Sequence, residues 1–217
     1  MRRRGEAGTG RSGETVSPSP RLPVSPSPPW RIFCAVELPG FVRAQLQEHI
    51  RQLREAVADQ SASWTRVENI HLTLKFFGNV AIERIPKVSA AVERAIRKFP
   101  TFPISIGKTG VFPNPRRAQV LWIGVSDPTG KLSELQRQLE HECAKEGFEK
   151  EDRAYRPHLT IARLRKPEGA RLLADAHLKM DFEPAEITLS ELIVFRSELS
   201  SKGSKYTAIS KHELSAR

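Results

Sequence analysis

The chain repeats one short motif in matching surroundings, and this repeat constrains its fold more than any other feature. The pattern His-x-Thr-x occurs at residues 71–74 and again 87 residues later, at 158–161. An apolar, strand-like segment, 31–38 or 118–125, begins 40 residues before each histidine, and a helical pattern lies between. This repeated order of strand, helix and strand predicts an internal duplication. Its halves can pair about a pseudo-twofold axis, which would bring both histidines into one cleft.

Each motif lies in a run of β-branched and apolar residues, which predicts a strand. Residues i and i+2 of a strand project from the same face. The imidazole and the hydroxyl of each motif should therefore lie side by side and face the cleft, while the apolar residues between them face a core. The same alternation places Lys75 on the face of His71 and Phe76 on the opposite face.

Helices and strands do not alternate one to one along the chain, which favours an α+β fold. We expect a two-lobed molecule with two antiparallel sheets facing a central cleft and helices packed outside. The predicted helices are about 41–58, 83–98, 130–146 and 167–177. The predicted strands are 31–38, 63–67, 71–77, 102–106, 118–125, 156–164, 185–197 and 205–213, with a turn-rich connection at 107–117.

The length of 217 residues suits one domain or two small lobes. Lysine and arginine total 35 against 25 aspartate and glutamate, a net charge of +10. A basic globular protein often binds a polyanion such as RNA or DNA, but a basic solvated surface has the same composition. Charge alone leaves both interpretations open.

The two cysteines, Cys34 and Cys143, predict neither a disulfide framework nor a zinc site. No apolar run approaches the roughly 20 residues of a membrane span. The basic N-terminus lacks the apolar stretch of a signal peptide. We therefore expect a cytoplasmic monomer without a membrane partner.

Residues 1–29 differ in composition from the rest of the chain. They contain six of the 16 prolines and a repeated Val-Ser-Pro-Ser-Pro segment, with almost nothing apolar to bury. This composition predicts a disordered tail that is dispensable for the activity of the remaining domain, residues 30–217.

Several segments resemble the 2H phosphoesterase superfamily, and in particular its RNA 2′,3′-cyclic phosphodiesterases, also described as 2′-5′ RNA ligases. The resemblance covers about residues 30–214. The segments that carry it are His71-Leu-Thr-Leu-Lys-Phe-Phe-Gly78, Gly110-Val-Phe-Pro113, Val120-Leu-Trp-Ile-Gly124, Pro157-His-Leu-Thr-Ile-Ala-Arg163, Phe195-Arg-Ser-Glu198 and Tyr206. One His-x-Thr-x is a weak signal, whereas two copies with matching upstream elements are a strong one.

The resemblance implies a two-lobed fold with one catalytic histidine from each lobe. It implies that His71 is the general acid (the proton donor) and His158 the general base (the proton acceptor). Arg163 matches the family's arginine five residues beyond the second histidine, and Phe76 matches an aromatic residue that lines the nucleotide site. The implied reaction is hydrolysis of an RNA 2′,3′-cyclic phosphate end to a 2′-phosphomonoester.

The residue types suit this chemistry. Attacking water must lose a proton while the leaving ribose oxygen gains one, and two imidazoles can hold opposite protonation states near neutrality. The hydroxyls of Thr73 and Thr160 can donate to the phosphate oxygens, and Arg163 can add a charge-assisted contact. Because the motif is His-x-Thr without an accompanying carboxylate cluster, we expect neither a metal nor another cofactor.

Two alternatives remain open from the sequence. One is reversible 2′-5′ ligation of tRNA halves, and the other is a non-catalytic RNA-binding module, which would not require both histidines. The remaining aromatic and histidine residues have no partner motif. We expect the tryptophans to serve packing and the other histidines to lie at the surface: Trp30, Trp64, Trp122, His49, His141, His177 and His212.

Overall fold

The computed structural model describes residues 28–57, 62–165, 167–201 and 203–215. The predicted tail lies almost wholly outside these residues, so its conformation stays a prediction. Four α-helices are described: α1 (Gly40–Ala56), α2 (Ile85–Ile96), α3 (Lys131–Lys145) and α4 (Pro167–Lys179). Three short 3₁₀ helices join other elements: η1 (Val67–Asn69), η2 (Ile82–Arg84) and η3 (Pro115–Arg117).

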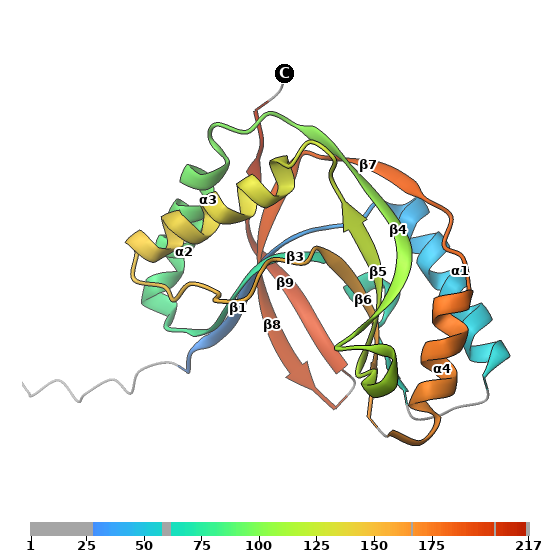
Figure 1. The fold of residues 1–217 in the computed structure, drawn as a ribbon. Coiled ribbons are helices and arrows are strands. Elements are labelled where there is room, and N and C mark those ends of the chain that lie inside the picture. Colours follow the sequence, from blue (N-terminus) through green and yellow to red (C-terminus); the bar gives the residue numbers. More distant parts are fainter. Residues whose placement is uncertain (1–27, 58–61, 166, 202, 216–217) are drawn as a thin grey trace, which may run out of the picture.

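Two antiparallel sheets form the centre of the molecule, which confirms the predicted fold class (Figure 1). The first sheet has the order β3-β1-β8-β9, with strands β3 (Leu72–Val80), β1 (Trp30–Val36), β8 (Glu191–Ser200) and β9 (Gly203–Glu213). The second has the order β2-β6-β5-β4-β7, with strands β2 (Ala62–Trp64), β6 (His158–Leu164), β5 (Val120–Ser126), β4 (Phe102–Phe112) and β7 (Ala185–Leu189).

The helices cover the outer faces of the two sheets as two pairs. Helices α2 and α3 lie side by side against the first sheet, and α1 and α4 lie together on the side of the second (Figure 1). Helix α1 follows β1 of the first sheet but lies on the second, and α3 follows β5 of the second sheet but lies on the first. Each duplicated unit therefore sends its helix across to the other lobe, which explains why neither lobe is continuous in sequence.

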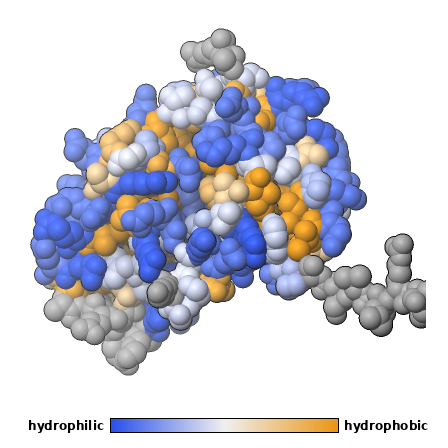
Figure 2. Space-filling model, turned by 180° about the vertical axis from the view of Figure 1, so that it is seen from behind, coloured by the Kyte–Doolittle hydropathy of each residue, from blue (hydrophilic) through white to orange (hydrophobic). Residues whose placement is uncertain are grey.

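Apolar stripes at helical spacing hold these helices to the core. In α1, Val42, Leu46 and Leu53 are fully buried, and in α2 Val88 and Val92 are as well. Each such side chain contributes about 1.5–3 kcal/mol when it leaves water. Figure 2 shows that the face of the molecule opposite to the view in Figure 1 is largely hydrophilic, with hydrophobic side chains in smaller patches.

The prediction of a single strand at residues 185–197 was wrong, because these residues belong to two strands in different sheets. Strand β7 pairs with β4 in the second sheet, and β8 pairs with β1 and β9 in the first. The chain passes between the sheets at Ser190. Apolar residues continue on both sides of this position because both strands are buried, so the local pattern shows no break.

The predicted turn at 107–117 was also partly wrong, because β4 continues to Phe112. The Pro-Asn-Pro sequence at 113–115 suggested a turn-rich connection, but the residues before it continue the strand, and Gly110 is needed there for close packing. A Cβ atom at Gly110 would lie 2.1 Å from the indole ring of Trp122 on the neighbouring strand. This glycine therefore makes room for an aromatic ring inside the sheet.

Candidate active site

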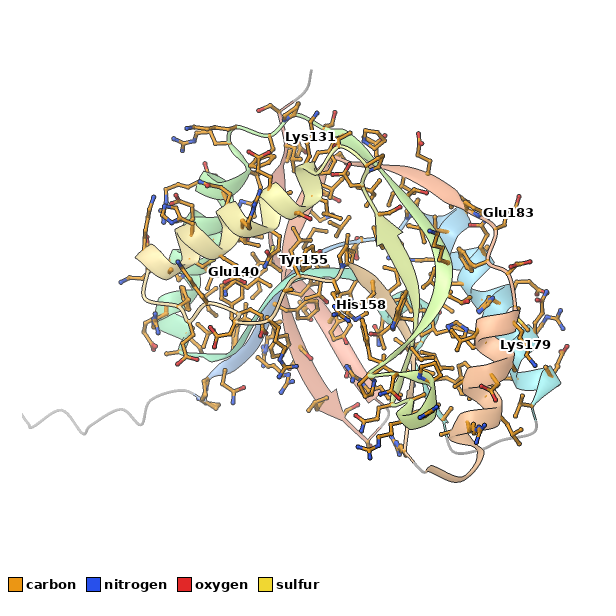
Figure 3. All side chains as sticks on the ribbon, viewed as in Figure 1. Lys131, Glu140, Tyr155, His158, Lys179 and Glu183 are labelled. Atoms are coloured by element: carbon orange, nitrogen blue, oxygen red, sulfur yellow. The ribbon has the colours of Figure 1, made fainter. Side chains whose placement is uncertain are left out.

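The two motifs meet across the space between the sheets. His71 immediately precedes β3, and His158 begins β6. Figure 3 shows His158 in the middle of the molecule, between the lobes. One pocket, with a volume of about 330 Å³, is lined by all six residues predicted for the site: His71, Thr73, Phe76, His158, Thr160 and Arg163. We call it the hairpin-side pocket because residues of the β8–β9 hairpin form its outer end.

The two imidazoles are held in the same way. The Nδ1 atom of His71 lies 2.8 Å from the carbonyl oxygen of Asn69, and Nδ1 of His158 lies 2.6 Å from that of Arg156. Each carbonyl belongs to the residue two positions earlier. Because a carbonyl oxygen only accepts, each Nδ1 carries a proton and donates. The Nε2 atom of each ring is then left to exchange a proton with a ligand.

Burial and neighbouring charges act on both histidines. Burial lowers the pKa of His71, while the carbonyl of Asn69 and the negative charge of Glu37 oppose this shift. Burial also lowers the pKa of His158, opposed by the carbonyl of Arg156. Here the nearby charge acts in the other direction, because the guanidinium of Arg163 lowers the pKa of His158 further. The two imidazoles therefore have neighbours of opposite charge.

A β-bulge follows the threonine of each motif. In β3, Thr73 pairs with Ala35 but Lys75 pairs with Cys34, so the residue between them, Leu74, is extra. In β6, Thr160 pairs with Trp122 and Ala162 with Leu121, so Ile161 is extra. The two extra residues are again 87 positions apart. An extra residue in a strand reverses the alternation beyond it.

The bulges bring two further side chains into the site. Beyond them, Phe76 and Arg163 rejoin the face of the motif threonines and line the hairpin-side pocket. The alternation rule was therefore wrong in placing Phe76 on the opposite face. Phe76 and Arg163 occupy equivalent positions of the duplicated unit, one contributing a half-exposed ring and the other an exposed guanidinium.

Lys75 lies on the other side of the strand for the same reason, so its predicted place beside His71 was wrong. Its side chain is 2% exposed and its Nζ donates to Glu140 of α3 at 2.5 Å. A second hydrogen bond, at 2.8 Å, joins Nζ to the carbonyl oxygen of Glu149. Lys75 thus ties the first motif strand to the segment that leads into the second motif.

Aromatic rings surround both imidazoles. Phe33 of β1 stacks on His71 with ring centroids 4.7 Å apart, and Tyr206 of β9 meets the same ring edge-on at 5.3 Å. Phe112 of β4 meets His158 edge-on at 5.0 Å. Neither Phe33 nor Phe112 was predicted for the site. Phe33 lies in an apolar strand and has the pattern of a core residue, and Phe112 lies in the segment that was predicted as a turn-rich connection.

A second pocket, of about 780 Å³, opens on the other side of the motifs, and we call it the α3-side pocket. Five residues line both pockets: Thr73, Phe76, His158, Thr160 and Arg163. His71 lines the hairpin-side pocket but not the α3-side pocket. Two carboxylates, Glu140 and Glu151, line the α3-side pocket. The described residues that line the hairpin-side pocket include two arginines and no carboxylate.

Two further histidines are buried, which corrects their predicted surface position. The Nε2 atom of His49 on α1 lies 3.1 Å from Nδ1 of His177 on α4, and Nε2 of His177 lies 3.1 Å from the carbonyl oxygen of Trp122. Burial, followed by the neighbouring imidazole, lowers the pKa of His49 to about 4. His141 is exposed as predicted, and His212 is half-buried.

In the part of the chain that the structure describes, no helix has the length and apolar character needed to cross a membrane. Nor do three or more His, Cys, Asp or Glu side chains in these ranges gather as a set of metal ligands.

Two facing antiparallel sheets, outer helices and one His-x-Thr motif from each sheet place the chain in the class of two-histidine phosphoesterase folds. The sequence model of the 2′-5′ RNA ligase superfamily matches residues 42–200. The chain therefore belongs to this superfamily, as its motifs predicted.

Relatives with known names agree with this assignment. The chain is 37% identical over 180 residues to the RNA 2′,3′-cyclic phosphodiesterase of Methanothermobacter thermautotrophicus, covering 82% of this chain and 95% of that protein. It is 30% identical over 181 residues to the protein of the same name from Thermotoga maritima, covering 82% and 92%. The apo crystal structure of Escherichia coli LigT superposes with a TM-score of 0.67, 24% identity and coverage of 87% and 99%, which supports the fold.

Proposed function

We propose that the chain hydrolyses RNA 2′,3′-cyclic phosphate ends to 2′-phosphomonoester ends, without a metal, by paired histidine catalysis. The observation that carries the proposal is the matched presentation of two imidazoles, each with Nδ1 held by a carbonyl, at one pocket with two threonines. The printed names of the relatives, RNA 2′,3′-cyclic phosphodiesterase, support the substrate class.

The reaction needs one proton removed and one supplied. Nε2 of His158 accepts a proton from water as the water oxygen forms a bond to phosphorus. The bond between phosphorus and O3′ breaks on the opposite side, and Nε2–H of His71 donates its proton to O3′. The phosphate stays on O2′. Each proton transfer by a positioned side chain typically contributes about 10²–10⁴-fold in rate.

The neighbouring charges support this assignment of roles. Burial lowers the pKa of His71, but the negative charge of Glu37 opposes this shift and so favours the protonated form that a general acid requires. Arg163 lowers the pKa of His158 and favours its neutral form, as a general base requires. Burial lowers the pKa of both imidazoles, but the charged neighbours act in opposite directions, which is the kind of difference that separates an acid from a base partner.

The remaining site residues would bind the phosphate. The hydroxyls of Thr73 and Thr160 donate to its non-bridging oxygens, and Arg163 supplies positive charge where negative charge accumulates in the transition state. The presence of both imidazoles favours an enzyme over an RNA-binding module, since binding alone would not require a proton donor and a proton acceptor.

Incubation of the protein with uridine 2′,3′-cyclic phosphate and EDTA, followed by phosphorus NMR, tests the proposal. We expect uridine 2′-phosphate as the product at a rate that EDTA does not change. His71→Ala and His158→Ala should each lower kcat at least about 100-fold. His141→Ala, on the exposed face of α3, is the control and should retain activity.

Other outcomes contradict separate parts of the proposal. A 3′-phosphate product would reverse the assignment of the leaving oxygen. Loss of activity in EDTA that a divalent ion restores would show that a metal is required. A folded histidine variant, verified by circular dichroism, with a near wild-type rate would rule out the two-histidine mechanism.

A further inference from the structure

The hairpin-side pocket contains an arginine that the reaction does not use. Arg31 of β1 is exposed, and its Cζ lies 4.6 Å from the centroid of the Phe76 ring. In the described residues, no carboxylate lies within ion-pair distance of it. Its partner on β8, Ser197, is small and lines the same pocket. The guanidinium is therefore held in place by a ring while its charge stays available.

The strand register gives the position of Arg31 relative to the reacting phosphate. Along β1, Ala35 pairs with Thr73, Phe33 with Phe76, and Arg31 with Asn79. Successive side chains on one face of a strand are roughly 7 Å apart. On this face of β1, Arg31 is thus the second side chain outward from Ala35, the residue that pairs with Thr73. The rings of Phe33 and Phe76 lie between these two levels. Arg163 lines both pockets and lies beside the His-x-Thr motifs. The two arginines therefore lie at different distances from the reacting phosphate.

The proposed chemistry determines which pocket holds the terminal nucleoside. The leaving O3′ must lie beside His71, and His71 lines only the hairpin-side pocket. The volume of 330 Å³ is at the lower end of small-ligand sites, about 300–1,000 Å³. The charged residues described in its lining are Arg31 and Arg163, whereas the α3-side pocket combines cationic side chains with two carboxylates, so the choice between the pockets rests on His71.

The chemistry of ribose then gives the direction of the RNA chain. A 2′,3′-cyclic phosphate is attached to one edge of the furanose ring, and C5′ projects from the other side. With the cyclic phosphate at the histidines, the phosphodiester on O5′ is one nucleotide farther out in the same pocket. Arg31 is the cationic side chain at that outer level.

We propose that Arg31, supported by the Phe76 ring, binds the phosphodiester on the 5′ side of the terminal nucleotide. This site distinguishes an RNA end from a free cyclic mononucleotide, and the inference rests on the proposed function. A guanidinium on an aromatic face is pre-organised to donate to a phosphate oxygen. The contact is remote from the reacting bonds, so it contributes equally to ground-state and transition-state binding and changes KM more than kcat.

The test compares two substrates that differ at one position. Uridine 2′,3′-cyclic phosphate has a free 5′-hydroxyl, and its 5′-methylphosphate diester adds the upstream phosphate without a second base. Arg31→Gln should raise KM for the diester about fivefold to tenfold, with kcat unchanged. KM for the 5′-hydroxyl substrate should stay the same. The increase of KM with salt for the diester should be weaker in the variant, because the charge contact that salt screens is lost.

Arg196→Gln is the matched control. Arg196 of the same sheet also stacks on an aromatic ring, with Cζ 4.1 Å from the centroid of Trp30, but it does not line the pocket. Its replacement should leave KM unchanged for both the diester and the 5′-hydroxyl substrate. If Arg31→Gln raises KM equally for both substrates, or for neither, the proposed site is wrong. If the wild-type protein turns over neither substrate, the proposed function itself fails, whatever the role of Arg31.

Discussion

At the scale of single residues, the feature that matters most for mechanism is the difference between two similar imidazoles. Both are partly buried and both donate Nδ1–H to a carbonyl two residues earlier. Burial lowers the pKa of each, but Glu37 acts against this at His71 and Arg163 adds to it at His158. Sequence equivalence within a duplication therefore does not mean chemical equivalence, because each ring has a different charged neighbour.

The pH dependence of kcat/KM should show this difference. Both histidine pKa values lie below the ordinary 6.5, so the centre of the bell-shaped profile should lie below pH 6.5. The acidic limb reports deprotonation of His158, the base. Arg163→Gln removes a charge that lowers this pKa, so the acidic limb should move to higher pH while the alkaline limb, set by His71, stays in place. NMR titration of the imidazole signals checks both shifts, and an unchanged His158 pKa would contradict the electrostatic role of Arg163.

At the scale of elements, the segment between α3 and β6 connects the two motifs. The hydroxyl of Tyr155 donates to the carbonyl oxygen of Thr73 at 3.2 Å, and burial raises the pKa of this phenol, which keeps it a donor. The next residue, Arg156, supplies the carbonyl that holds His158. Lys75 binds the same segment through Glu149. This segment therefore links the catalytic groups of the two lobes, and Figure 3 shows Tyr155 in the middle of the molecule, near His158.

Replacing Tyr155 by phenylalanine should reduce catalysis more than it reduces stability. The change removes one hydrogen bond, worth about 1 kcal/mol, but it frees the segment that orients His158. Because small displacements of catalytic groups are costly, we expect kcat to fall about tenfold with little change in KM. Steady-state kinetics and thermal unfolding measure the two effects. Lys150→Gln, an exposed change in the same segment, should leave both unchanged. A Tyr155→Phe enzyme with wild-type kcat would show that the hydrogen bond has no positioning role.

At the scale of the whole molecule, each duplicated unit packs its helix on the other lobe. Helix α1 lies with α4 on the second sheet, where the buried pair of His49 and His177 joins the two helices. Helix α3 lies on the first sheet and supplies Glu140 to Lys75. The lobes are thus joined by two helix crossings, which favours a fixed separation between the catalytic histidines.

Removal of residues 1–29 should leave this arrangement and the activity intact. The site residues all lie beyond this segment, and the superfamily match begins at residue 42. Five arginines and two glutamates give the segment a charge of +3, which leaves +7 on the remaining residues. We expect kcat and KM for uridine 2′,3′-cyclic phosphate within about twofold of the full chain and an unchanged melting temperature. A large loss of kcat in the folded truncated protein would assign this segment a catalytic role.

The sequence by itself determined the features that depend on local periodicity and on the duplication. Two strands with His-x-Thr motifs, four amphipathic helices and the α+β class follow from spacings within one element, where period 2 or 3.6 reflects backbone geometry. The meeting of His71 and His158 also follows, because equivalent positions of a duplicated unit pair about its axis. The six predicted site residues do line one pocket, while their chemical roles remain for the experiments above.

Only the tertiary structure decided what depends on a partner element. The bulges at Leu74 and Ile161 arise from pairing with neighbouring strands, and they turn Phe76 and Arg163 into the pocket and Lys75 toward Glu140. His49 and His177 are buried because helices 128 residues apart in sequence pack together. The division of residues 185–197 between two sheets likewise depends on which strand lies alongside. Local sequence cannot specify these features, because a residue's side chain direction after a bulge, its burial and its charged neighbours are properties of the contacts and not of the segment.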